Sequence, residues 1–482
     1  MSVFRSTKSK FTFYSLILSI LLVAAGTASA VGTWVDNQAG ASVLGQGNFT
    51  QATAASGPSS MFQPSAVRFD PASSKLFVAD CANNRILRFA NVQAIASGGS
   101  AEAAFGQSDL NGVTGGFSQS KFRCAGEMAI DSSGHLWVAD IDNSRVLRWD
   151  NATTLASGQP ANAVLGQPDF TTTSAGATQG KLNLPEGLFI DNNGTLWVAD
   201  TGNNRVLRFD NAAGKANGAN ADAVLGQIDF VSNGSAMTQT SLAAPNSITG
   251  NSAGSIWISD SGNNRVLRFD VAASKANGGN ADGILGSASF TSLTSAATTR
   301  TGMDTPTGVT IDPEGRLHVA DGINDRVLIF ASASAIANGT GASNVLGQPN
   351  FTDATARLSQ SGFDMPYTPT WDDSSQSLWV PDLANNRVVR FVPQTTTSGN
   401  VSLSGRVLDR SGNGVRNARV DFTDPSSGLI RSTVTNSFGS YSFVNVPSGS
   451  TLVMNVSVRS LTYTSRVVQL FDNLANVNFT PQ

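Results

Sequence analysis

A single phrase that recurs six times at a nearly fixed spacing constrains this chain more than any other feature. A representative copy occupies residues 196–209 and reads LWVADTGNNRVLRF. The aspartates that mark the copies are 60, 60, 60, 61 and 61 residues apart and are Asp80, Asp140, Asp200, Asp260, Asp321 and Asp382. Self-similarity at a fixed period of this length is the mark of a repeat architecture. The sequence therefore predicts six similar units, each packed against its neighbours.

Two further phrases keep the same period and show what each unit contains. One is typified by V-L-G-Q, and its glycines are Gly45, Gly106, Gly166, Gly226, Gly286 and Gly347. The other reads PEGLFID at residues 185–191 and precedes the main phrase. Each unit thus offers four short apolar or alternating runs between turn residues, which is typical of strands. Because the run at 196–199 is apolar on both faces, each four-stranded antiparallel sheet is expected to pack on both sides, as in a β-propeller.

The order of the phrases predicts how the ring closes. The first V-L-G-Q copy, at residues 43–46, comes before any complete unit, while the last unit ends at 387–391 without one. An N-terminal strand must therefore complete the sixth blade, and pairing the two chain ends leaves no open sheet edge. We expect an all-β chain with a six-bladed propeller over residues 41–393.

The repeated polar residues are predicted to be structural. In the turn of the third copy, Asp200 is expected to accept the backbone N–H two residues on, Gly202 to supply a positive φ, and Asn203 to tolerate the left-handed conformation. A catalytic site normally occurs once, whereas a scaffold feature recurs in every unit. The arginines expected to reach the repeated aspartates are Arg85, Arg145, Arg205, Arg265, Arg326 and Arg387. The aromatic column expected to pack between blades is Phe77, Trp137, Trp197, Trp257, His318 and Trp379.

The main phrase, with the preceding P-x-G-L-x-I-D, resembles the NHL repeat, and the six copies cover some three quarters of the chain. This resemblance implies a propeller fold. The units are longer than the usual NHL repeat because stretches such as residues 171–181 separate successive blades. Some NHL proteins bind RNA through a basic face, but this chain has 31 Lys+Arg against 34 Asp+Glu. Nucleic acid is therefore not an expected partner.

Two cysteines break the repeat. Cys81 follows Asp80 in the first blade, and Cys124 precedes the inner strand of the second. In an up-and-down blade these two loops emerge on the same face, in adjacent blades. We therefore predict a disulfide between Cys81 and Cys124, which an exported protein permits. The alternative is two separate buried thiols.

The loops that lead into the inner strands border the central funnel and carry the most variable polar residues. Glu127, Glu186 and Asn246 lie there on consecutive blades and offer oxygen ligands for Ca²⁺. Gluconolactonase-like propellers place a catalytic metal in a comparable position, so a calcium-dependent hydrolase or lactonase is the alternative prediction. Solvated loop polarity is the simpler interpretation. A zinc lyase is disfavoured because the chain has only His135 and His318, in different blades.

A second domain follows a linker at residues 392–400. Residues 401–482 carry G-x-V-x-D at 405–409 and G-x-Y-x-F at 439–443, between alternating runs and turns. These phrases resemble the carboxypeptidase regulatory-like, transthyretin-like domain, which implies a small β-sandwich that acts as a folding, spacing or interaction module. The segment contains no His or Cys, so no catalytic constellation is visible in it.

Residues 1–30 read as a cleaved secretory signal. Arg5, Lys8 and Lys10 precede an apolar run at 11–25, followed by small residues at 28–30. The run is shorter than the roughly 20 residues of a membrane span, so an uncleaved anchor is the weaker alternative. We predict a secreted or surface protein without a cofactor, acting as a non-enzymatic scaffold for a protein, peptide or carbohydrate. A purely structural envelope component is a further alternative.

Overall fold

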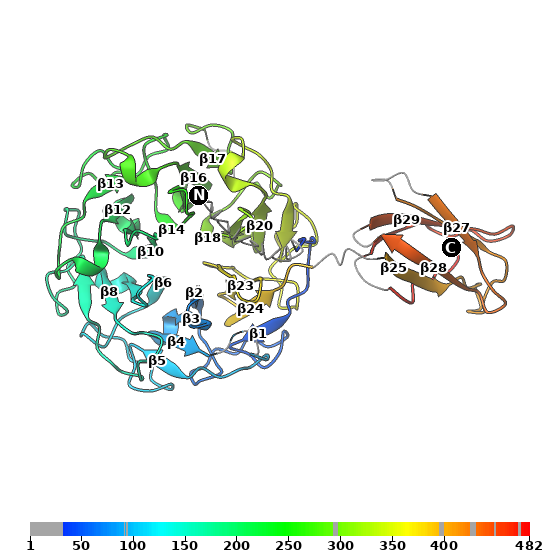
Figure 1. Cartoon of the computed structure of the whole chain (residues 1–482), viewed down its shortest axis with the longest axis horizontal. Coiled ribbons are helices and arrows are strands. Elements are labelled where there is room, and N and C mark those ends of the chain that lie inside the picture. Colours follow the sequence, from blue (N-terminus) through cyan, green and yellow to red (C-terminus); the bar gives the residue numbers. More distant parts are fainter. Residues whose placement is uncertain are drawn as a thin grey trace, which may run out of the picture. The chain divides into compact units, whose positions relative to one another are not determined.

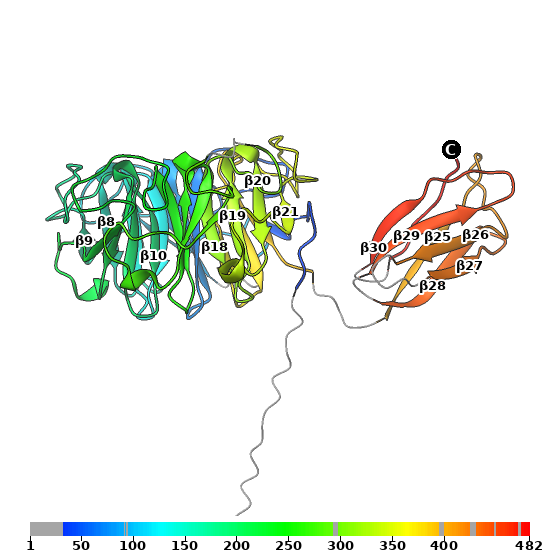
Figure 2. The ribbon, with the colours of Figure 1, turned by 90° about the horizontal axis from the view of Figure 1, so that it is seen from above.

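The computed structural model describes residues 32–482 apart from 91, 93–94, 293–296, 395–399, 425–429, 448–449 and 471–473. The chain divides into two compact units, and residues 32–396 and 397–482 form their described parts (Figures 1 and 2). The segment predicted to be a signal lies outside the described residues, and so does most of the predicted linker. Within the described residues, no helix is long and apolar enough to cross a membrane.

The first unit contains six four-stranded antiparallel sheets arranged around a central axis (Figure 1). The inner strands are β2 (Pro64–Asp70), β6 (Ala125–Ile130), β10 (Pro185–Ile190), β14 (Pro245–Gly250), β18 (Pro306–Ile311) and β22 (Thr370–Asp372). The second strands are β3 (Lys75–Asp80), β7 (Leu136–Asp140), β11 (Leu196–Asp200), β15 (Ile256–Asp260), β19 (Leu317–Asp321) and β23 (Ser377–Asp382). The third strands are β4 (Arg85–Phe89), β8 (Arg145–Trp149), β12 (Arg205–Phe209), β16 (Arg265–Phe269), β20 (Arg326–Phe330) and β24 (Arg387–Phe391). The outer strands are β5 (Ala103–Phe105), β9 (Ala163–Leu165), β13 (Ala223–Leu225), β17 (Gly283–Leu285), β21 (Asn344–Leu346) and β1 (Ser42–Leu44).

The sixth blade is closed by the N-terminal strand, which confirms the predicted closure. β1 pairs with β24 in an antiparallel register that sets Val43 opposite Val389. Thr33 and Gln394 also form a bridge, so the propeller unit includes residues on both sides of the expected 41–393. Joining both chain ends in one sheet leaves the ring without a free edge at its seam.

Short 3-10 helices make the turns between the second and third strands. In the third blade η3 (Thr201–Asn203) fills this turn, and the left-handed residue is Asn204, with φ of 53°. The expectation that Gly202 and Asn203 would hold the special conformations was wrong, because residues 201–203 form a right-handed helical turn that the chain leaves only at Asn204. The expected acceptance by Asp200 of the N–H two residues on was also wrong, because Gly202 donates to the Asn183 carbonyl and Asp200 accepts the N–H of Asn183. Equivalent turns are η1 (Cys81–Asn83), η2 (Ile141–Asn143), η5 (Ser261–Asn263) and η7 (Gly322–Asn324). Further 3-10 turns follow three of the third strands, at η4 (Ala212–Gly214), η6 (Ala272–Ser274) and η8 (Ala333–Ala335).

Apolar side chains fill the spaces between blades. Trp197 on β11 packs among residues of the next blade, including Ile248, and is 2% exposed. His318 is fully buried in the aromatic column and stacks on Trp371 with the ring centroids 6.0 Å apart. Its Nε2 lies 3.1 Å from Asp312 Oδ2. His318 is therefore part of the packed interior.

The second unit is a β-sandwich. One sheet pairs β25 (Asn400–Arg406) with β28 (Ser440–Pro447). The other has the order β27 (Ile430–Val434), β26 (Arg419–Thr423), β29 (Ser450–Ser457) and β30 (Arg466–Leu470). Phe422 and Phe443 meet edge to face in the core, with centroids 4.8 Å apart. Tyr441 is also in the core, where its hydroxyl donates to the Val477 carbonyl over 2.6 Å.

Candidate functional site

The repeated aspartate and arginine form a buried ion pair in every blade. In the third blade Arg205 Nε lies 2.7 Å from Asp200 Oδ2, and both side chains are fully buried. The other pairs are Asp80–Arg85, Asp140–Arg145, Asp260–Arg265, Asp321–Arg326 and Asp382–Arg387. Burial raises the pKa of Asp200 to about 6, against the opposing effect of Arg205.

Each arginine of these pairs also ties loops to its blade. Arg205 Nη2 donates to the carbonyls of Thr178 and Lys181, and Nη1 donates to that of Phe230. Every nitrogen of the guanidinium therefore has a protein partner. Four of its five N–H groups are thus used within the protein, which supports the structural interpretation of the repeat.

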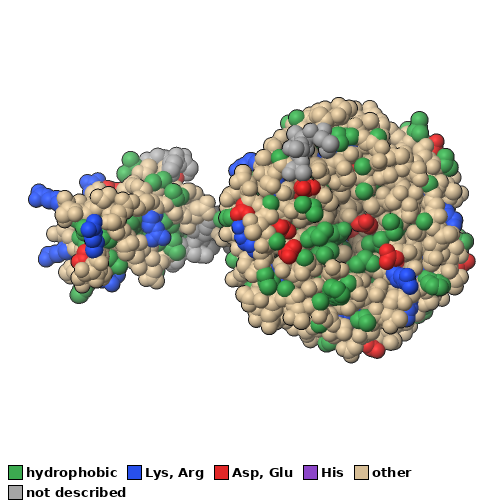
Figure 3. Space-filling view, turned by 180° about the vertical axis from the view of Figure 1, so that it is seen from behind, with side chains coloured by type: hydrophobic (Ala, Val, Ile, Leu, Met, Phe, Trp, Pro, Cys, Tyr) green, Lys and Arg blue, Asp and Glu red, His purple; other side chains and the backbone are tan. Residues whose placement is uncertain are grey.

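Cys81 and Cys124 form a disulfide, as the topology argument predicted. The bond joins the turn of the first blade to the loop before β6 in the second. Both cysteines line a cavity of about 230 Å³ at the end of the channel where the inner strands begin. Figure 3 shows a hollow at the centre of one propeller face, with hydrophobic side chains gathered around it.

The three residues predicted as alternative metal ligands all line this smaller cavity. Asn246 Nδ2 donates to Glu186 Oε2, and the Tyr367 hydroxyl lies 3.5 Å from the same oxygen. Burial raises the pKa of Glu186 to about 7, and its two hydrogen-bond donors only partly offset this. Glu186 thus has neutral partners and no cation beside it.

Glu127 lies deeper and is bound to a residue that sequence reasoning did not single out. Its Oε1 is 3.1 Å from Nη2 of Arg68, on the inner strand of the first blade. Its Oε2 accepts the backbone N–H groups of Leu188 and Ile248, over 3.2 and 3.4 Å. Burial raises the pKa of Glu127 to about 7, with Arg68 acting in the opposite direction. Glu127 therefore reaches across the channel to three other blades.

These contacts fit a metal ion poorly. One of the two carboxylates already binds a guanidinium and two amides, so a cation would have to displace Arg68. In the described residues no group of three or more His, Cys, Asp or Glu side chains could hold a metal ion. The calcium site stays a prediction without support from this arrangement.

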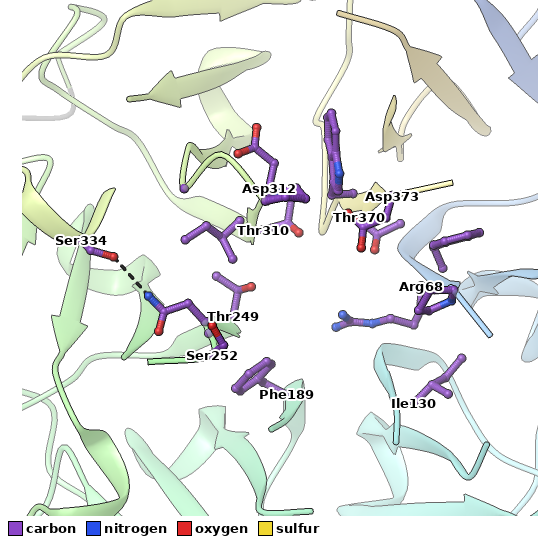
Figure 4. Close-up of a pocket in the computed structure, with 18 residues that line it drawn as sticks. Arg68, Ile130, Phe189, Thr249, Ser252, Thr310, Asp312, Ser334, Thr370 and Asp373 are labelled. Carbon is purple, nitrogen blue, oxygen red and sulfur yellow. Dashed lines mark hydrogen bonds between the residues drawn. The ribbon is translucent and has the colours of Figure 1, made fainter. Parts of the chain in front are cut away.

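A larger cavity, of about 520 Å³, lies at the opposite end of the inner strands (Figure 4). Arg68 enters it from the first blade, and Phe189 enters it from the third. Thr249, Thr310 and Thr370 enter it from the fourth, fifth and sixth blades. The Arg68 guanidinium projects toward the middle of the cavity (Figure 4). The Arg68–Glu127 pair therefore stands between this cavity and the smaller one.

The threonines of the larger cavity have unused hydroxyls. Thr249, Thr310 and Thr370 are 7%, 6% and 3% exposed, respectively. Within the described part of the chain, none of their hydroxyls has a hydrogen-bond partner. They occupy equivalent positions of their inner strands, two residues before Asn251, Asp312 and Asp372.

A comparison of the inner strands would have revealed this ring. The residue two before the end of the P-x-G-L-x-I-D phrase is Arg68 in the first blade, Phe189 in the third and threonine in the last three. The polar residues predicted as site candidates lie at the beginning of the inner strands, whereas this ring lies at their end. Arg68 is the charged residue at this position of the repeat. That departure from the other blades was the sequence feature that could have pointed to the larger cavity.

The comparisons with known proteins agree with this domain organisation. Residues 402–481 match the carboxypeptidase regulatory-like domain, and residues 182–209 match the NHL repeat. No curated protein matches the chain.

Several solved propeller structures are similar. A virginiamycin B lyase from Staphylococcus aureus has 14% identity and a TM-score of 0.38, covering 68% of this chain and 94% of that one. A gluconolactonase from Xanthomonas campestris has 14% identity and a TM-score of 0.43, covering 76% and 98%. An auxiliary nutrient binding protein from Bacteroides thetaiotaomicron has 13% identity and a TM-score of 0.44, covering 75% of each chain. Their likeness concerns the fold, which does not fix an activity. The chain contains a β-propeller whose third blade matches the NHL repeat, and its residues 402–481 match the carboxypeptidase regulatory-like domain.

Proposed function

We propose that this protein is an exported, non-enzymatic binding scaffold whose ligand occupies the larger cavity at the centre of the propeller. The observation that carries this proposal is a ring of three threonines at the cavity wall, 7%, 6% and 3% exposed, whose hydroxyls have no hydrogen-bond partner among the described residues. Water completes such groups in a free cavity, and a ligand with matching oxygens would displace that water. A volume of about 520 Å³ is also within the range of small-molecule sites.

The arrangement favours binding over catalysis. The smaller cavity holds a carboxyl group with a raised pKa in Glu186, but its partners are Asn246 and Tyr367 rather than a nucleophile or a base. The larger cavity contains an arginine, three threonine hydroxyls and the carboxylates of Asp312 and Asp373. Asp312 is already paired with Arg316, so the arginine and the hydroxyls are the groups that would bind and orient a ligand. The Cys81–Cys124 disulfide is compatible with export.

The test is a thermal-shift and calorimetric screen of the purified protein with neutral sugars, sugar acids, amino acids and short peptides. We expect at least one class to raise the Tm of the wild-type protein and to lose that effect in Arg68→Gln. Arg459→Gln is the matched control, because Arg459 is an exposed arginine of the second unit. The proposal is contradicted if no class shifts the Tm, or if Arg68→Gln responds as the wild type does.

A further inference from the structure

We infer that the ligand of the larger cavity is a small sugar acid with one carboxylate, which Arg68 binds while the threonine ring binds the hydroxyl groups. This inference rests on the proposed function and narrows it to a ligand class. It follows from the free side of the Arg68 guanidinium, the charges that face the cavity, and the chemistry of its walls.

The Arg68 guanidinium is held in place on one side and free on the other. Its Nε donates to the Met128 carbonyl over 2.7 Å, and its Nη2 contacts Glu127. Among the described residues, Nη1 has no acceptor. Two N–H bonds of a fixed cation therefore face the cavity, where they can donate to an anionic oxygen. Hydrogen bonds from a guanidinium to a carboxylate are stronger than those between neutral groups.

The charges around the cavity disfavour an anion that carries more than one charge. Besides Arg68, the charged residues that line it are Asp312 and Asp373. Asp312 is neutralised by Arg316 and also contacts His318. Asp373 has no ion-pair partner in the described chain, and Glu127 offsets part of the charge on Arg68. Since Asp373 is unpaired, the cavity carries no net positive charge, and a carboxylate can bind there only through direct hydrogen bonds to Arg68 Nη1. A phosphate or sulfate dianion would meet a stronger repulsion than an anion with a single charge.

The walls suit a polyhydroxylated body. Thr249, Thr310 and Thr370 stand on three consecutive blades, so their hydroxyls offer an arc of groups that both donate and accept. Phe189 adds an apolar face beside them. Its ring packs directly over Gly250, where a Cβ atom would lie 2.5 Å from Phe189 Cε1. The glycine thus fixes an aromatic ring at the cavity wall, and sugars pair hydroxyl edges with apolar faces.

The decisive experiment compares sugar acids with neutral sugars of the same shape. Isothermal titration would pair galacturonate with galactose, glucuronate with glucose, and mannuronate with mannose, with sodium sulfate as a dianion. We expect one acid to bind at least about tenfold more tightly than its neutral partner, and sulfate to bind more weakly than that acid. Neutral sugars that bind as tightly as the acids would overturn the inference and leave the proposed function standing. No binding by any member would overturn the inference, and failure of the wider screen as well would overturn the proposed function.

Variants locate the carboxylate. Arg68→Gln should reduce the affinity for the acid by at least about tenfold and leave that for the neutral sugar within about twofold. The single Arg68→Gln variant leaves Glu127 buried and without its cation. The Arg68→Gln, Glu127→Gln double variant removes both charges, and so it tests the same loss of acid binding without an unpaired carboxylate. Asp373→Asn should strengthen acid binding, since it removes a like charge from the cavity. Weaker acid binding by Asp373→Asn would show that the ligand carries a cation there, and would contradict a simple sugar acid.

Discussion

Two kinds of buried ion pair occur in the propeller, and they differ in what their arginines do. Arg205 and its five counterparts use every guanidinium nitrogen on the protein itself. Arg68 occurs in one blade only, is paired with Glu127, and keeps Nη1 free toward a cavity. The same residue type therefore holds the scaffold together in one place and offers a binding group in the other. In the sequence, the two kinds of arginine differ in that the structural one recurs in every blade and Arg68 occurs once.

The largest expected effect is on the repeated pairs. Arg205→Ala leaves Asp200 charged and unpaired in the interior, and breaking a buried pair in this way costs about 3–5 kcal/mol. Chemical unfolding of the variant beside Arg459→Gln measures the difference. A loss below about 1 kcal/mol would show that the repeated pairs are not the structural elements described here.

The second largest effect on the free energy of unfolding should come from removing the disulfide. Cys81 and Cys124 are 43 residues apart, and a natural disulfide that closes such a loop contributes about 2–4 kcal/mol. Cys81→Ala, Cys124→Ala should therefore unfold at a lower denaturant concentration than the oxidised wild type. The reduced wild type is the control, and it should resemble the double variant. Equal midpoints for all three proteins would contradict a stabilising role.

Stability should also depend on Glu186. Its pKa is about 7 in the folded protein, above the usual value of 4.5. At a pH between these two values, the carboxyl group keeps its proton in the folded state and has lost it in the unfolded state. Stability therefore falls as the pH rises from about 5 to 8, by about 1–3 kcal/mol for this group. Glu186→Gln should flatten that slope, measured as the change in unfolding free energy with pH. If the unfolding free energy of Glu186→Gln changes with pH as steeply as that of the wild type, the Glu186 pKa is not raised by burial.

The smallest expected effect separates two threonines of the same strand, β18. Thr307 donates to the Pro366 carbonyl over 2.7 Å, so Thr307→Val should cost about 1 kcal/mol. The Thr310 hydroxyl has no partner among the residues that the structure describes, so Thr310→Val should change stability by less than about 0.5 kcal/mol while weakening ligand binding. Unfolding and titration of both variants test this contrast. It fails if the two substitutions are equally destabilising.

The architecture could be predicted from the sequence because the same pattern of strands and turns occurs six times. Each copy repeats the strand pattern, and the unpaired V-L-G-Q run at residues 43–46 indicates the closure. The left-handed position was misassigned by one or two residues, because Gly202 suggests a positive φ that the helical turn moves to Asn204.

The site was harder to predict because it depends on residues that do not share a motif. The spacing of Glu127, Glu186 and Asn246 placed them correctly beside one cavity. It could not show that Glu127 pairs with Arg68 of the neighbouring blade. That contact depends on how far two long side chains extend and on where they point, which no motif specifies. The threonine ring carries no motif either, because a threonine in a strand is ordinary until its hydroxyl is found without a partner.

The most direct test of the central claim is a crystal structure of the protein with the tightest-binding sugar acid of the panel. We expect the ligand to lie in the larger cavity, with its carboxylate within hydrogen-bond distance of Arg68 Nη1 and its hydroxyls at Thr249, Thr310 and Thr370. A ligand bound instead beside Glu186 and Asn246 in the smaller cavity, or on the outer surface of the blades, would contradict it.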